Sequence, residues 1–199
     1  MNRFYMNFHA FFKPIFAVLY PMSVEGLEHL REDTPVVFCA NHASALDPIL
    51  FCLALPRRVP MRMMAKKELM NTPLLGWLLR KLGGFGVDRG NADLAAVKTA
   101  MKAIKDGNNL LVFPEGTRVD DEGEVRAKGG VVMIAMRTGA MLQPVFVDGK
   151  KRLFRRTRIV FGEAYTPVAA ARRATAEEYQ TFADDVLHRA YALGQEAEK

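Results

Sequence analysis

The sequence predicts a single α/β domain with a largely parallel, helix-covered sheet, preceded by an N-terminal amphipathic helix. Segments of strand and helix character alternate along most of the chain, which is typical of a sheet covered by helices. Half of the 199 residues are hydrophobic, enough for one core of ordinary size. Repeats, low-complexity tracts and long polar linkers are absent from the sequence, so we expect the helix at residues 1–21 and one domain at 22–199.

The N-terminal helix carries an aromatic stripe. Apolar residues recur at i, i+3, i+4 and i+7 and so share one side of the helix; they are Met1, Phe4, Tyr5, Phe8, Phe11, Phe12, Ile15, Phe16 and Leu19. Lys13 and Pro14 interrupt the run, which is too short to cross a bilayer because a span needs ~20 mostly apolar residues. We favour a helix lying in the membrane interface; packing on the protein's own core is the alternative.

The expected strands and helices alternate after this segment. The expected strands cover residues 36–38, 59–65, 85–87, 110–113, 142–147 and 158–161. One expected helix begins at Asp47-Pro48, and the others cover 72–81, 92–105, 131–137 and 175–193, the last stopped by Gly194. The first strand is a short apolar run after Pro35, which indicates burial on both faces. Ligand sites of such folds lie just after the strands.

The turn after the first strand holds a candidate base, His42, five residues before Asp47. If the Asp47 carboxylate accepts the imidazole Nδ1–H, it selects one tautomer and leaves the Nε2 lone pair free to take a proton from a hydroxyl. The alternative is that His42 makes ordinary turn hydrogen bonds and that Asp47 only caps the helix that follows.

Three further stretches adjoin strands: GGFGVDR at 83–89, FPEGTR at 113–118 and QPV at 143–145. Arg89 and Arg118 stand at strand ends, where a guanidinium can bind a phosphate through two parallel hydrogen bonds. Pro144, inside a strand pattern, indicates an edge strand or a break. Taken singly, each stretch also fits turn chemistry or a surface ion pair.

Composition narrows the class of partner. A formal charge of +6 indicates an acidic partner such as lipid head groups, and no nucleic-acid-binding motif is present. The densest basic run, KKRLFRRTR at 150–158, is expected to be a solvated rim or a contact with the membrane. The four histidines lack metal-ligand spacing. Cys39 and Cys52 stand in apolar surroundings, which favours core packing and a reducing compartment.

Taken in order, NHASALDP, GGFGVDR, FPEGTR and QPV resemble the four-motif pattern of the glycerolipid acyltransferases. Over roughly residues 36–160 the chain is similar to the bacterial 1-acyl-sn-glycerol-3-phosphate acyltransferases. The resemblance implies that His42 is the general base and Asp47 its orienting carboxylate, and that the acceptor hydroxyl attacks an acyl thioester directly. It also implies substrate binding by seven residues, of which Lys66 and Arg118 contact the phosphate and Pro144 lies on the acyl side: Lys66, Arg89, Glu115, Gly116, Thr117, Arg118 and Pro144.

The same resemblance implies an activity: acylation of 1-acyl-sn-glycerol 3-phosphate to phosphatidic acid, with acyl-CoA or acyl carrier protein as co-substrate and without a metal or cofactor. It implies a peripheral protein at the cytoplasmic face of the cell membrane. Gly86, Val119 and Gln143 depart from the family pattern and leave chain length and acceptor open. Another lysophospholipid or glycerol 3-phosphate is an alternative acceptor, and a catalytically silent lipid-binding protein is the alternative class. Ser44 lies in no G-x-S-x-G elbow and is expected to be a turn residue.

Overall fold

The computed structural model describes residues 3–59, 61–88, 93–119, 125–149, 151–171 and 174–196. Within these ranges one seven-stranded sheet has the order β1-β7-β6-β2-β5-β3-β4, and every neighbouring pair is parallel except β6 and β7. The strands are β1 (Met22–Glu25), β2 (Val36–Ala40), β3 (Met61–Lys66), β4 (Gly84–Val87), β5 (Asn109–Val112), β6 (Met141–Val147) and β7 (Thr157–Phe161). The predicted α/β domain with a mostly parallel sheet is confirmed.

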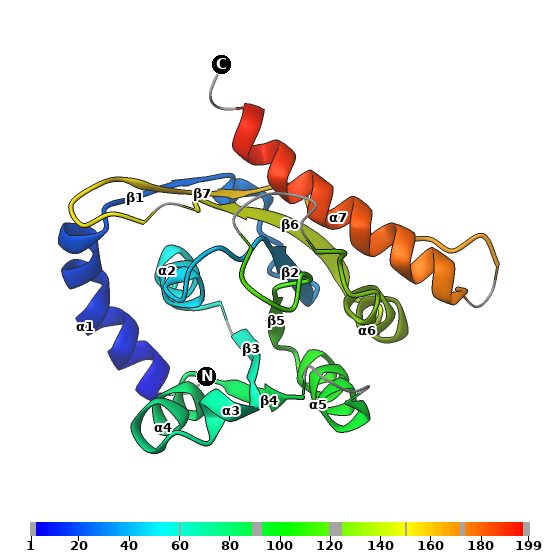
Figure 1. Cartoon of the computed structure of the whole chain (residues 1–199), viewed down its shortest axis with the longest axis horizontal. Helices are drawn as coiled ribbons and strands as arrows, with labels where there is room; N and C mark the ends of the chain where they lie inside the picture. The colour runs from blue at the N-terminus through cyan, green and yellow to red at the C-terminus, as the bar shows by residue number, and fades with distance from the viewer. Residues whose placement is uncertain are drawn as a thin grey trace.

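Helices cover both faces of this sheet (Figure 1). They are α1 (Arg3–Leu19), α2 (Asp47–Ala54), α3 (Lys67–Met70), α4 (Pro73–Lys81), α5 (Leu94–Lys105), α6 (Gly130–Thr138) and α7 (Ala176–Glu196), with a 3₁₀ turn η1 at Leu27–His29. Helices α1 and α2 lie on one side of the central strands, and α5, α6 and α7 lie on the other. None of these described helices combines the length and the apolar character that crossing a membrane requires.

Strand β2 is buried along its whole length, as its apolar run predicts. Val36, Phe38 and Ala40 face the core beneath α1 and α2, whereas Val37 and Cys39 face the core beneath α5, α6 and α7. This alternation follows from the two-residue period of a strand. Side chains of β2 are therefore packed in both cores, and the turn that follows β2 begins at a firmly held strand.

The two cysteines are free and buried, as expected. Burial raises the pKa of the Cys39 thiol, and it raises the pKa of Cys52 to about 12. Both side chains therefore remain protonated thiols at neutral pH and serve as core residues.

The aromatic side of α1 packs on the protein itself. Tyr5, Phe8 and His9 are buried, and the Phe4 ring meets the Trp77 ring of α4 edge-on at 5.4 Å. The imidazole of His9 lies 3.0 Å from the Leu55 carbonyl, and burial lowers its pKa. Core packing, the alternative left open by the sequence, thus accounts for most of the stripe. A narrower stripe of Phe11, Ile15 and Val18 remains exposed.

Two short elements and one helix end differ from the expected pattern. Strand β1, which pairs with β7, and helix α3, which follows β3 directly, were not predicted. Each has only four residues, too few for a periodic pattern of hydrophobic residues to be recognised. The expected stop at Gly194 is wrong, because α7 continues to Glu196. Gly194 lies against the Phe146 ring, where a Cβ atom would come within 2.6 Å of a ring carbon. A larger residue at this position would therefore require the Phe146 ring to shift.

Pro144 was expected to mark an edge strand or a break, and this expectation is wrong. β6 lies inside the sheet between β7 and β2, where Pro144 is paired with Cys39. Its carbonyl accepts the Gly162 N–H at 2.9 Å, but proline has no N–H to return. The Gln143 side chain supplies that donor, since its Nε2 donates to the Gly162 carbonyl at 2.7 Å. The neighbouring amide thereby accommodates a proline in an interior strand.

This substitution of donors is testable. Q143M keeps the length of the side chain but leaves the Gly162 carbonyl without the amide donor, so we expect the free energy of unfolding in urea to fall by ~1–3 kcal/mol. P144A restores a backbone N–H facing Gly162. Q143M should therefore cost less stability in the P144A background than in the wild type. An equal loss in both backgrounds would show that the amide does not replace the proline's missing donor.

Candidate active site

His42 lies in the turn between β2 and α2, and its imidazole is held by Asp47. The Nδ1 atom of His42 is 3.0 Å from Oδ2 of Asp47, whose side chain is 0 % exposed. The same Oδ2 accepts the backbone N–H groups of Ala43 at 2.9 Å and Ser44 at 2.7 Å. Since a carboxylate only accepts, Nδ1 carries the proton and Nε2 carries the lone pair. The pair has the geometry that a general base requires.

Asp47 does not serve as a simple helix cap. Leu46 occupies the capping position of α2, and no side chain there bonds to the first turn. The Asp47 carboxylate instead points back across the turn to the donors of residues 42–44. The capping alternative therefore does not describe this residue, although its place in the first turn still suits a negative charge at a helix N-terminus.

The turn at residues 113–118 follows β5, the strand beside β2, and it contacts His42. The Phe113 ring stacks on the imidazole, with centroids 4.1 Å apart and planes 23° apart. The backbone of His42 donates its N–H to Oε2 of Glu115 at 2.8 Å and accepts the Val119 N–H at 2.8 Å. The first and third motifs are thus in direct contact. Nothing in the sequence indicated that Phe113 would stack on the imidazole.

Glu115 is buried, with 2 % of its surface exposed. Its Oε2 binds the His42 N–H, and its Oε1 accepts the Tyr191 hydroxyl of α7 at 2.6 Å. Through these two hydrogen bonds, Glu115 links the backbone of His42 to the C-terminal helix. A direct contact between Glu115 and substrate stays a prediction. Tyr191, 76 positions away in sequence, carries no motif that could have identified it.

The remainder of this turn faces outward. Gly116 has a φ of +72°, which glycine adopts without strain, and its N–H closes the turn on the Phe113 carbonyl at 3.0 Å. Thr117 and Arg118 are exposed. No ion pair joins Arg118 to another described residue. The guanidinium is therefore available to an anion from solution.

Two lysines could add positive charge beside this turn: one ends the neighbouring strand, and the other contacts the turn itself. Lys66 ends β3, next to β5, and its exposed ammonium is 3.7 Å from Glu68. Lys128 approaches Gly116, since a Cβ there would lie 3.5 Å from the Lys128 side chain. Its N–H also donates to the Pro114 carbonyl at 2.8 Å. Lys128 was not among the predicted binding residues.

Of the other two predicted binding residues, the structure describes only Pro144. Pro144 is buried within β6, three residues before the end of the strand. Arg89 lies outside the described residues. The binding roles of both stay predictions.

An apolar pocket of about 430 Å³ adjoins the dyad. Phe113, the ring that stacks on His42, also lines this pocket, as do Gly116 and Lys128. The other lining side chains are mostly apolar and come from β3, β4, β5, α5 and α6; they include Met64, Val87, Val97, Val112, Val131 and Ile134. The base and the apolar pocket therefore share a wall.

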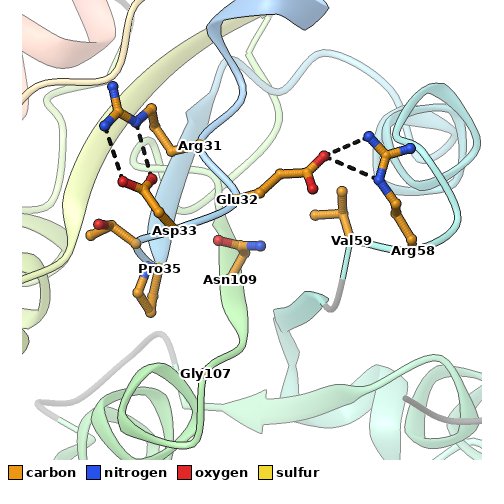
Figure 2. Close-up of a pocket in the computed structure, with 9 residues that line it drawn as sticks. Arg31, Glu32, Asp33, Pro35, Arg58, Val59, Gly107 and Asn109 are labelled. Carbon is orange, nitrogen blue, oxygen red and sulfur yellow. Dashed lines mark hydrogen bonds and ion pairs between the residues drawn. The ribbon is translucent and has the colours of Figure 1, made fainter.

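A second pocket, of about 280 Å³, lies at the other edge of the sheet. Figure 2 shows its charged side chains paired with one another: Arg31 with Asp33 at 3.2 Å, and Arg58 with Glu32 at 2.5 Å. Its other walls include Pro35 and Asn109, at the amino ends of β2 and β5. Because its charges are satisfied internally and the base is at the opposite strand ends, this pocket is no part of the site. Within the described chain, no group of three or more His, Cys, Asp or Glu side chains is arranged to hold a metal ion.

Comparisons with known proteins agree with this geometry. The family model described as Acyltransferase matches residues 21–148. The 1-acyl-sn-glycerol-3-phosphate acyltransferase of Bacillus subtilis is 33% identical over 148 residues, covering 71% of this chain and 72% of that protein. The chloroplastic 1-acyl-sn-glycerol-3-phosphate acyltransferase LPAT1 of Arabidopsis thaliana is 30% identical over 155 residues, covering 74% of this chain and 43% of that protein. The match thus spans less than half of the plant protein.

A solved structure shows the same architecture over nearly the whole chain. The crystal structure of the 1-acyl-sn-glycerophosphate (LPA) acyltransferase PlsC from Thermotoga maritima superimposes with a TM-score of 0.71 at 25% identity. The superposition covers 99% of this chain and 80% of that one. The sheet and its flanking helices are therefore shared with that protein.

Proposed function

The chain belongs to the acyltransferase family, and on that premise we propose that it moves a fatty acyl group from a thioester donor to the free hydroxyl of 1-acyl-sn-glycerol 3-phosphate, giving phosphatidic acid. The observation that carries the proposal is the buried His42–Asp47 pair beside a turn that presents Arg118 to solvent. The names of the relatives in Bacillus subtilis and Arabidopsis thaliana support this acceptor. A silent lipid-binding protein would have no use for an oriented base.

The transfer needs only the groups described above. Nε2 of His42 takes the acceptor's hydroxyl proton while the hydroxyl oxygen attacks the thioester carbonyl carbon. The Asp47 carboxylate, 3.0 Å from Nδ1, stabilises the imidazolium that forms. The tetrahedral intermediate then collapses, the carbon–sulfur bond breaks, and the imidazolium returns the proton to the leaving thiolate. No acyl-enzyme forms on this route, and Cys39 and Cys52 are too buried to take part.

The acceptor phosphate is proposed to bind at Arg118, with further positive charge from Lys128, which approaches Gly116, and from Lys66 at the end of the neighbouring strand β3. Arg118 presents a planar set of donors that matches a phosphate, and no described residue forms an ion pair with it. The outward-facing Gly116 and Thr117 complete this surface. We propose that Arg89, outside the described residues, contributes as the family resemblance implies.

The acyl chain is proposed to enter the 430 Å³ pocket that Phe113 shares with His42. A long alkyl chain is stabilised by leaving water at roughly 0.8 kcal/mol per buried CH₂ group. Acyl-CoA and acyl carrier protein are both anionic donors, and the formal charge of +6 favours their approach. The base, the carboxylate and the cations account for the reaction without a further cofactor.

The proposed location is peripheral, on the cytoplasmic face of the cell membrane. Phe11, Ile15 and Val18 form the exposed stripe of α1. The segment at 152–156 lies beside the end of this helix, because the Phe154 N–H donates to the Leu19 carbonyl at 2.7 Å. Phe154 is 66 % exposed and Leu153 is exposed as well. Three exposed arginines flank these two apolar side chains, which suits a surface of anionic lipid.

The reaction itself is tested with an acceptor panel and one labelled acyl donor, with product mass as the readout. We expect turnover with 1-acyl-sn-glycerol 3-phosphate and at least ~10²-fold lower kcat for H42A, the usual effect of losing a general base. S44A, a change on the same turn, should lower kcat less than about tenfold because no acyl-serine forms. Unchanged turnover in folded H42A would refute the base, and a preference for another acceptor would refute the proposed substrate.

The phosphate site is tested by R118A. Losing a charge-assisted contact of roughly 1.5–3 kcal/mol should raise the acceptor KM about ten- to a hundred-fold while the donor KM stays unchanged. The matched control is R137A, because Arg137 is also exposed but lies at the far end of α6. A rise in the donor KM alone would place Arg118 on the donor side instead.

The membrane contact is tested by flotation with anionic vesicles. We expect F11S/V18S and a variant with Arg152, Arg155 and Arg156 changed to Gln each to bind vesicles less, since apolar burial and charge both contribute. Turnover of a water-soluble, short-chain acceptor should be unchanged in both. L94S/V168S removes equally exposed apolar side chains elsewhere and should bind like the wild type. Undiminished binding of both test variants would show that the anchor lies elsewhere.

A further inference from the structure

Lys151 differs from the rest of its basic run. The run was expected to be a solvated rim or a membrane contact, and the side chains at 152–156 are indeed exposed. The Lys151 side chain, by contrast, is only 3 % exposed, and its ammonium forms an ion pair with Oδ1 of Asp47. A lysine is almost never buried unless it is paired. The expectation of a solvated rim is therefore wrong at Lys151, because a buried carboxylate is its partner.

The two oxygens of Asp47 have separate partners. Oδ2 accepts from Nδ1 of His42 and from two backbone N–H groups of the turn. Oδ1 is buried, makes no well-aligned hydrogen bond with any described group, and faces the Lys151 ammonium. Lys151 is also anchored by donating to the Asp148 carbonyl. The ammonium therefore occupies the side of the carboxylate that the catalytic turn leaves open.

We propose that Lys151 is a positioning residue of the dyad. By holding Oδ1, the ammonium prevents the carboxylate from rotating about its Cβ–Cγ bond, and Oδ2 stays directed at Nδ1 of His42. It also supplies the counter-charge that a fully desolvated carboxylate requires. Lys151 acts through Asp47 and not on the substrate. The inference rests on the acyl transfer proposed above and adds a residue outside all four sequence motifs.

A purely structural role predicts different behaviour. If Lys151 only anchored the loop after β6 through the Asp148 carbonyl, its loss would lower stability without a specific effect on kcat. The loss would also be independent of Asp47. A role through Asp47 predicts a fall in kcat at nearly constant KM, and it predicts that the effect disappears once Asp47 no longer carries a charge.

The experiment uses the full chain with the labelled donor and a short-chain acceptor. K151M is neutral and similar in length, and it should lower kcat by about tenfold or more with little change in either KM. K151R keeps the charge and should retain more activity than K151M. K102M is the control, because Lys102 also pairs with an aspartate, Asp106, but on the exposed surface; its kcat should match the wild type.

The D47N background separates the two roles. There, K151M should change kcat by less than about threefold, because the group that Lys151 positions is already lost. The proposal is overturned if folded K151M keeps wild-type kcat, or if K151M causes the same fold loss in both backgrounds. If K151M alone does not fold, D47N/K151M should fold, since neither charge remains buried; failure of the double variant would assign Lys151 to the loop alone. If the wild type itself shows no turnover in this assay, the proposed function fails. If the wild type is active and the K151M results differ from those expected, only the role of Lys151 fails.

Discussion

A buried carboxylate governs the geometry of the site. Asp47 has no exposed surface, and a desolvated negative charge must be matched by donors and counter-charge. The chain provides two N–H groups of the turn, the imidazole of His42 and the ammonium of Lys151. The turn is curled around the carboxylate so that these groups converge. The orientation of the base is therefore a consequence of how the chain neutralises Asp47.

The strand order makes the second contribution, because it brings the motifs together. β5 lies beside β2, so the turn after β5 meets the turn after β2 at the same edge of the sheet. Phe113 then stacks on His42, and Glu115 binds its backbone. Tyr191 adds a contact from α7. A base on a flexible loop would lose its alignment, whereas His42 is held by its side chain, its ring face and both of its backbone polar groups.

The loop after β6 links the surface to the dyad. Lys151 reaches Asp47 from this loop, and three residues further on Phe154 is exposed and bonded through its N–H to the end of α1. The loop thus carries a buried cation at one end and an apolar, arginine-flanked tip at the other. The contact of this tip with α1 and the position of Lys151 therefore depend on the same four residues, 151–154.

The sequence by itself determined the α/β class and most strands and helices, and it made His42 and Asp47 a candidate pair that the structure then showed to be in contact. These depend on periodicity and on spacings of a few residues, which local physics dictates. Only the tertiary structure decided that the aromatic side of α1 packs inward, that Gln143 supplies the donor missing from Pro144, and that Lys151 and Tyr191 reach the site. These contacts join segments far apart in the chain or depend on which face of an element is covered, and no local pattern encodes either.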